Sequence, residues 1–64
     1  MKVTTEHTGL SRTFEVENEG VTYHLTVYFN TKGKIIDQEF EEEDVSEETE
    51  EAIMNFLEAN GYFD

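Results

Sequence analysis

Carboxylate groups dominate the chemistry that this sequence could perform, and they are concentrated between residues 37 and 51. Ten of these fifteen residues are Asp or Glu, and none is a base. Asp37, Glu39 and Glu41 alternate, so on an extended strand their carboxylates would point the same way, roughly 6.6 Å apart. That pitch is comparable to the step between adjacent phosphates along one nucleic-acid strand. Such a row could bind the lysines and arginines that otherwise bind phosphates.

Metal binding is a second chemistry open to alternating acids. An EF-hand loop also needs a central glycine and a terminal glutamate, but no glycine lies between Gly33 and Gly61. Carboxylates on a flat strand are spread out and do not wrap around one ion. We therefore expect no dedicated metal site and no cofactor, and only weak, adventitious binding of Ca²⁺ or Mg²⁺.

Catalysis is the third chemistry. A nucleophilic triad needs a serine or cysteine beside a base, but the chain has no cysteine, and Ser46 is better explained as a helix cap. His24 lies among threonines on an expected strand, where a solvated histidine is the simplest interpretation. One helix on a small sheet leaves little room for a pocket. We expect that the protein is not an enzyme.

The charge is strongly segregated along the chain. Residues 1–34 contain four acids and all four bases, whereas residues 35–64 contain twelve acids and no base, so the formal charge of −12 belongs to the C-terminal half. A surface that serves only solubility normally mixes both signs. This asymmetry predicts a basic protein as partner and argues against direct binding to nucleic acid or to an anionic membrane.

Length and composition indicate one small domain over residues 1–64. A chain of 64 residues is near the lower limit for a hydrophobic core without disulfides, and it has no cysteine to form them. The absence of cysteine fits the reducing cytoplasm, and no apolar run is long enough to span a membrane. Five Phe, three Tyr and well-patterned strands favour a folded chain over a disordered one.

Alternating apolar residues predict three strands, over residues 12–17, 21–30 and 34–41. Turn signals separate them, and keeping the apolar sets together places Phe14 opposite Leu25 and Phe29 opposite Ile36. The expected core contains Phe14, Tyr23, Leu25, Val27, Phe29, Ile36, Phe40, Ile53, Phe56 and Leu57. Residues 1–10 fit either a short edge strand or a frayed terminus.

A helix is predicted after the third strand. Asp44 or Ser46 would cap its start, and Asn60-Gly61 would end it in a Schellman motif. Its apolar residues recur at helical spacing, so one side packs on the sheet. The predicted fold is α+β, an antiparallel meander of strand order 1-2-3 with one C-terminal helix on one face and a possible extra N-terminal strand.

The candidate partner-binding residues follow the acids and the apolar side chains expected among them. Tyr28, Ile35 and Met54 are candidate apolar anchors, Met54 because helical spacing points it away from the core. The complete set is Glu15, Tyr28, Ile35, Asp37, Glu39, Glu41, Glu42, Glu43, Asp44, Glu47, Glu50, Glu51 and Met54.

The sequence therefore favours a non-enzymatic inhibitor or modulator that mimics nucleic acid and occupies a basic, nucleic-acid-binding surface of another protein. In size and acidity, though not through any motif, the chain resembles the small inhibitors that phages and mobile elements encode against host nucleic-acid enzymes. The alternative is a small structural or accessory module, a homodimer through an exposed strand edge, whose acidic face serves solubility only.

Overall fold

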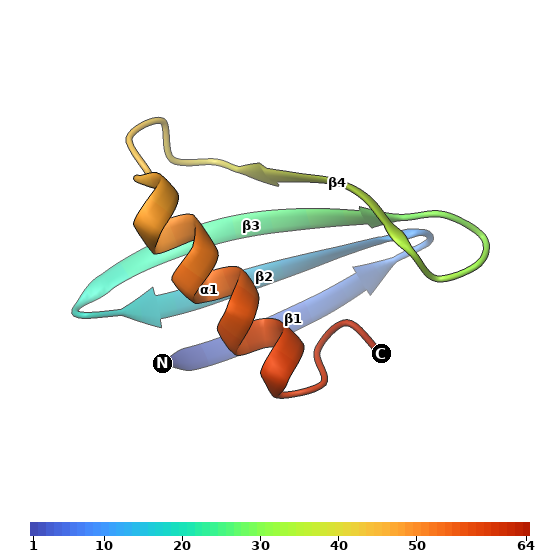
Figure 1. Cartoon of the computed structure of the whole chain (residues 1–64), viewed down its shortest axis with the longest axis horizontal. Coiled ribbons are helices and arrows are strands. Elements are labelled where there is room, and N and C mark those ends of the chain that lie inside the picture. Colours follow the sequence, from blue (N-terminus) through green and yellow to red (C-terminus); the bar gives the residue numbers. More distant parts are fainter.

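The computed structural model describes all 64 residues, as a four-stranded antiparallel sheet with one helix across one face (Figure 1). The strands are β1 (Lys2–Thr8), β2 (Ser11–Asn18), β3 (Val21–Phe29) and β4 (Ile35–Phe40), and the helix is α1 (Glu47–Ala59). The sheet order is β1-β2-β3-β4, which is the order of the chain. The predicted α+β fold with one C-terminal helix is confirmed, but the sheet has four strands rather than three, because the N-terminal segment forms a full strand.

Two tight turns connect the first three strands. Thr8 pairs with Ser11 across Gly9-Leu10, and Asn18 pairs with Val21 across Glu19-Gly20. Gly9 has φ 60°, and Glu19 and Gly20 have φ 52° and 79°. Such two-residue loops match the twist of the strands they join and fix the hairpin register.

The core lies between α1 and the sheet face that it covers. Phe14 is opposite Leu25, as predicted, because this register brings the apolar sides of β2 and β3 together. The C-terminal tail adds Tyr62 and Phe63, whose rings meet Phe14 edge to face. The buried residues are Phe14, Val16, Leu25, Val27, Phe29, Ile53 and Leu57.

The predicted register of β4 is wrong at its start, where the structure has a β-bulge. The register of β3 and β4 shifts between Tyr28 and Phe29, so Ile35 and not Ile36 lies opposite Phe29. The extra residue of a bulge re-aims the side chains next to it. Ile36 is 65% exposed and does not belong to the core, contrary to the sequence-based expectation.

The helix ends are formed as predicted. Ser46 is the N-cap, and its side chain accepts a hydrogen bond from the backbone N–H of Thr49 at 3.2 Å. At the other end, Gly61 takes φ 76°, and the Tyr62 N–H bonds to the Leu57 carbonyl at 3.0 Å, as in a Schellman motif. These caps fix where α1 starts and therefore where its first, acidic turn lies.

Candidate functional site

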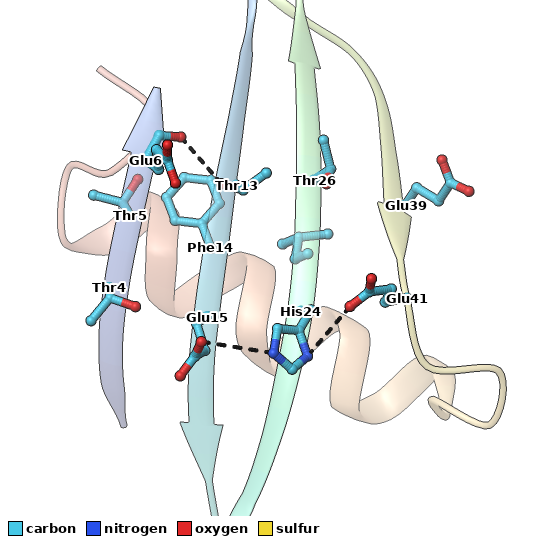
Figure 2. A pocket seen from close by; sticks show the side chains of 11 residues that line it. Thr4, Thr5, Glu6, Thr13, Phe14, Glu15, His24, Thr26, Glu39 and Glu41 are labelled. Carbon is cyan, nitrogen blue, oxygen red and sulfur yellow. Dashed lines mark hydrogen bonds and ion pairs between the residues drawn. The ribbon is translucent and has the colours of Figure 1, made fainter. Parts of the chain in front are cut away.

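The sheet face opposite α1 is hollowed rather than flat (Figure 2). Residues from all four strands line a depression of about 570 Å³. Four glutamates contribute to it, Glu6 from β1, Glu15 from β2, and Glu39 and Glu41 from β4 and the residue just after it. This face therefore carries an open depression, although the sequence predicted little room for a pocket.

His24 stands among carboxylates in this hollow. Its Nδ1 lies 2.7 Å from Glu42 Oε2 and 3.7 Å from Glu41, and its Nε2 lies 3.7 Å from Glu15. The sequence predicted a solvated histidine. The side chain is 47% exposed, but it is also paired with carboxylates. It connects β2, β3 and the start of the β4–α1 connection.

Glu42 holds His24 through two separate bonds. One carboxylate oxygen accepts the backbone N–H of His24 at 2.9 Å, while the other pairs with the ring. Next to this contact, the Glu41 N–H bonds to the His24 carbonyl at 2.9 Å. The Glu42 side chain therefore takes the place of the next backbone partner where β4 has ended, and it fastens the connection to the sheet.

These contacts shift two pKa values in opposite directions. The hydrogen bond to Glu42 is the main reason why the pKa of His24 is raised above 6.5, and it outweighs desolvation, which acts to lower it. For Glu42, desolvation is the largest single influence and acts to raise the pKa. The hydrogen bonds and charge of His24 together outweigh it, so the pKa of Glu42 is lowered from 4.5.

His24, Glu41 and Glu42 are also the residues that could hold a metal ion, since one atom from each lies within 4.8 Å of the others. The same atoms already pair with one another, and exposed carboxylates commonly gather without a metal. Their proximity is explained by ion pairing, so we assign them no metal or cofactor.

The remaining candidate acids follow the β4 edge around the molecule. Asp37 lies opposite Tyr28 and Glu39 lies opposite Thr26, so both acids share the hollowed face with His24. Glu43 and Asp44 lie in the connection, and α1 then begins with Glu47 beside the β4 side of the sheet (Figure 1). We call the set Asp37, Glu39, Glu41, Glu42, Glu43, Asp44, Glu47, Glu50 and Glu51 the acidic band.

No lysine or arginine neutralises this band. All the ion pairs in the structure involve His24. The only arginine, Arg12, donates to the carbonyls of Tyr62 and Asp64 and lies over the Phe29 ring at 4.6 Å. Sequence segregation of charge is therefore preserved as segregation in space.

The three candidate anchors are placed differently from one another. Tyr28 and Ile35 are each 37% exposed, near the end of the sheet that carries the β3–β4 loop. Met54 is half-buried and packs against the core, which corrects the expectation that it points away from it. It nevertheless lines a shallow second hollow of about 400 Å³ together with Glu47, Glu50 and Glu51.

The sequence missed the pairing of His24 with Glu42. The only signal in the sequence was weak: a lone histidine on one strand, and consecutive glutamates, residues 41–43, directly after the next strand.

Comparison with known proteins adds no relative, since neither a family model, a curated protein nor a solved structure matches the chain. The only helix, α1, is too short and too polar to cross a membrane.

Proposed function

We propose that this protein binds a basic surface of another protein without catalysing a reaction, and that this surface is one that otherwise binds nucleic acid. The observation that supports the proposal is the acidic band, whose carboxylates find no lysine or arginine within the molecule. Unpaired charges of one sign steer an oppositely charged partner and favour its binding. Binding would exclude nucleic acid, so the expected effect on the partner is inhibition.

The arrangement of the acids favours a nucleic-acid-binding surface over other basic surfaces. Asp37, Glu39 and Glu41 alternate along an extended segment, which spaces them roughly 6.6 Å apart along the chain. Proteins that bind nucleic acid place lysines and arginines along a groove to contact successive phosphates. A row of carboxylates at a similar step can occupy those bases together.

Binding explains the hollowed face better than catalysis does. The hydroxyl groups that line the hollow belong to threonines, and no cysteine exists in the chain. Ser46 is committed to the helix cap, and the Ser11 hydroxyl donates to the Thr8 carbonyl at 2.9 Å. Both ring nitrogens of His24 lie beside carboxylates, those of Glu42 and Glu15, and no hydroxyl group hydrogen-bonds to the ring. His24 therefore lacks the nucleophilic partner that a triad requires.

The test begins with capture of partners from a nuclease-treated lysate at low and moderate salt, followed by competition with a DNA or RNA duplex. We expect salt-sensitive capture of a nucleic-acid-binding protein, which the added duplex then displaces. A partner that the duplex does not displace, or whose affinity is indifferent to salt, would contradict the proposal.

A matched pair of variants then tests the acidic band. Glu39→Gln with Glu41→Gln removes two charges from the band, whereas Glu19→Gln with Glu58→Gln removes two exposed charges from outside it. Exposed ion pairs contribute about 0.2–1 kcal/mol each, so the first variant should weaken binding about 2- to 30-fold. The control should change affinity by at most about twofold. If both variants weakened binding equally, the acidic band would be only a solvated surface.

A further inference from the structure

We infer that the free edge of β1 is a second part of the binding surface, and that it accepts an extended segment of the basic partner as a fifth strand. This inference rests on the proposed function, since it specifies the conformation in which part of the partner binds. It is carried by the backbone of β1, which is a separate observation from the acidic band.

The backbone groups at this edge can be assigned from the hairpin register. Thr8 and Ser11 close a two-residue turn and therefore form a hydrogen-bonded pair. Alternation then directs the N–H and C=O groups of Val3, Thr5 and His7 away from β2. The same alternation accounts for His24, whose N–H and C=O point toward the β4 side and meet Glu42 and Glu41 at 2.9 Å each.

The two edges of the sheet differ in their protection. Exposed edges in natural proteins are usually blocked by charges, prolines, bulges or covering segments. The β4 edge has a bulge and two acids, Asp37 and Glu39.

The β1 edge also carries two charged residues, Lys2 and Glu6, but β1 pairs with β2 over seven consecutive residues without a bulge or proline, and no strand lies beyond it (Figure 1). Six of its seven residues are exposed. Figure 1 draws the C-terminal tail just outside this edge, but Tyr62 and Phe63 of the tail pack against Phe14 on the α1 face, which leaves the edge accessible to another strand.

Charge complementarity indicates a basic segment beside Thr4 and Glu6, since the only lysine of β1, Lys2, lies at the end of the strand. Thr4 and Glu6 line the hollow from β1, and Thr4 lies opposite Glu15 of β2. Cross-strand neighbours lie about 4.5–5.5 Å apart, so alternate side chains of an incoming strand would reach Glu6 directly and Glu15 across one strand. Edge pairing supplies backbone hydrogen bonds, and the alternate side chains supply specificity. A strand with bases at alternate positions fits both requirements.

Amide hydrogen exchange measured by NMR tests this inference residue by residue. The probe is a short peptide of alternating arginine and valine, as long as β1. In the protein alone, the amides of Val3, Thr5 and His7 should exchange much faster than those of Thr4 and Glu6. With the peptide bound, the first three should slow by at least about tenfold. A peptide methylated on alternate backbone nitrogens, which cannot pair along one edge, should produce no such protection.

A proline substitution provides the matched protein variant. The Thr5 N–H points out of the sheet, so Thr5→Pro removes an edge donor while leaving the β1–β2 ladder intact. This variant should fold with an unchanged circular dichroism spectrum and lose the peptide-induced protection. If Thr5→Pro does not fold, the methylated peptide still decides the question with the unmodified protein.

The outcomes separate this inference from the proposed function. Peptide binding that shifts the Glu39 and Glu41 resonances but leaves the β1 edge amides exchanging freely overturns the inference and leaves the proposed function standing. Failure of the peptide to bind also overturns the inference, whereas the duplex competition decides the proposed function. If the edge amides became protected as the protein concentration rises, without peptide, the occupant would be a second copy of this chain. That result would overturn the inference that a basic strand binds there.

Discussion

Two alanine substitutions, Leu25→Ala and Ile36→Ala, test the bulge that separates the structure from the simple alternating pattern. Both residues belong to the core in the sequence-based register. In the structure, Leu25 is 1% exposed and Ile36 is 65% exposed. The two variants should therefore differ widely in free energy of unfolding, although each removes similar aliphatic bulk.

The expected magnitudes follow from burial. Leu25→Ala leaves a cavity in a packed core and should cost about 2–5 kcal/mol. About a third of Ile36 is covered, and full burial of such a side chain stabilises by about 1.5–3 kcal/mol, so its burial contributes roughly 0.5–1 kcal/mol. Isoleucine also has a higher strand propensity than alanine, which adds less than about 1 kcal/mol. Ile36→Ala should cost about 0.5–1.5 kcal/mol.

Urea denaturation followed by circular dichroism measures the difference. A domain of 64 residues has a free energy of unfolding of about 3–10 kcal/mol, at roughly 0.05–0.15 kcal/mol per residue. Leu25→Ala should therefore remove a large share of the stability, and Ile36→Ala only a small one. The denaturant slope should stay unchanged in both, so that the midpoints can be compared directly.

Equal costs for the two substitutions would refute the reasoning. A loss of about 2–5 kcal/mol on Ile36→Ala would mean that this residue is buried opposite Phe29, as a strand without a bulge requires. Ile35→Ala provides the internal comparison, since Ile35 is the residue that the observed register places opposite Phe29.

Three further predictions concern the cap, the histidine cluster and the charge. Ser46→Ala should lower the free energy of unfolding by about 0.5–2 kcal/mol in the same urea assay, because the Thr49 N–H loses its acceptor. An NMR titration should show that Glu42→Gln lowers the pKa of His24, while Glu43→Gln changes it much less. Because the pKa of His24 is raised on folding, its contribution to stability is fully present below pH 6.5 and is lost as pH rises through the pKa of the folded state. Because the pKa of Glu42 is lowered on folding, its contribution is present above pH 4.5 and is lost as pH falls through the pKa of the folded state. Their joint contribution should be greatest between these two pH values, and Glu42→Gln should flatten that part of the stability profile. Finally, the melting temperature should rise from low to moderate NaCl, because salt screens the uncompensated acids, and a flat or falling curve would contradict this self-repulsion.

The regular elements could be predicted because each follows a local rule. The alternation in residues 21–29 predicts β3, and Ser46 and Gly61 mark both ends of α1. The register of β2 and β3 follows from burying Phe14 with Leu25, since a one-residue slip would expose one apolar set. Local periodicity and turn chemistry were sufficient for these features.

The remaining features depend on contacts between distant residues. The bulge arises where the β3–β4 loop joins the sheet, and the pattern Ile35-Ile36 allows either residue to face Phe29. The pairing of His24 with Glu42 requires the chain to turn away from the sheet immediately after Phe40, which alternation alone does not specify. Placement of β1 as a full strand likewise needed the partner strand β2, since six of its seven residues are exposed and carry little burial pattern.

The meander topology places the acidic part of the sequence at the β4 edge of the sheet. Because strand order follows chain order, the formal charges of Lys, Arg, Asp and Glu sum to 0 on β1, −1 on β2, 0 on β3 and −2 on β4, and β4 leads into the acidic first turn of α1. The basic partner that we propose would therefore be attracted most strongly at the β4 side. An incoming strand meets the least protection at β1, on the opposite edge. These two preferences are compatible only if the partner crosses the hollowed face between them, and there its bases would meet Glu15 and compete with His24 for carboxylates.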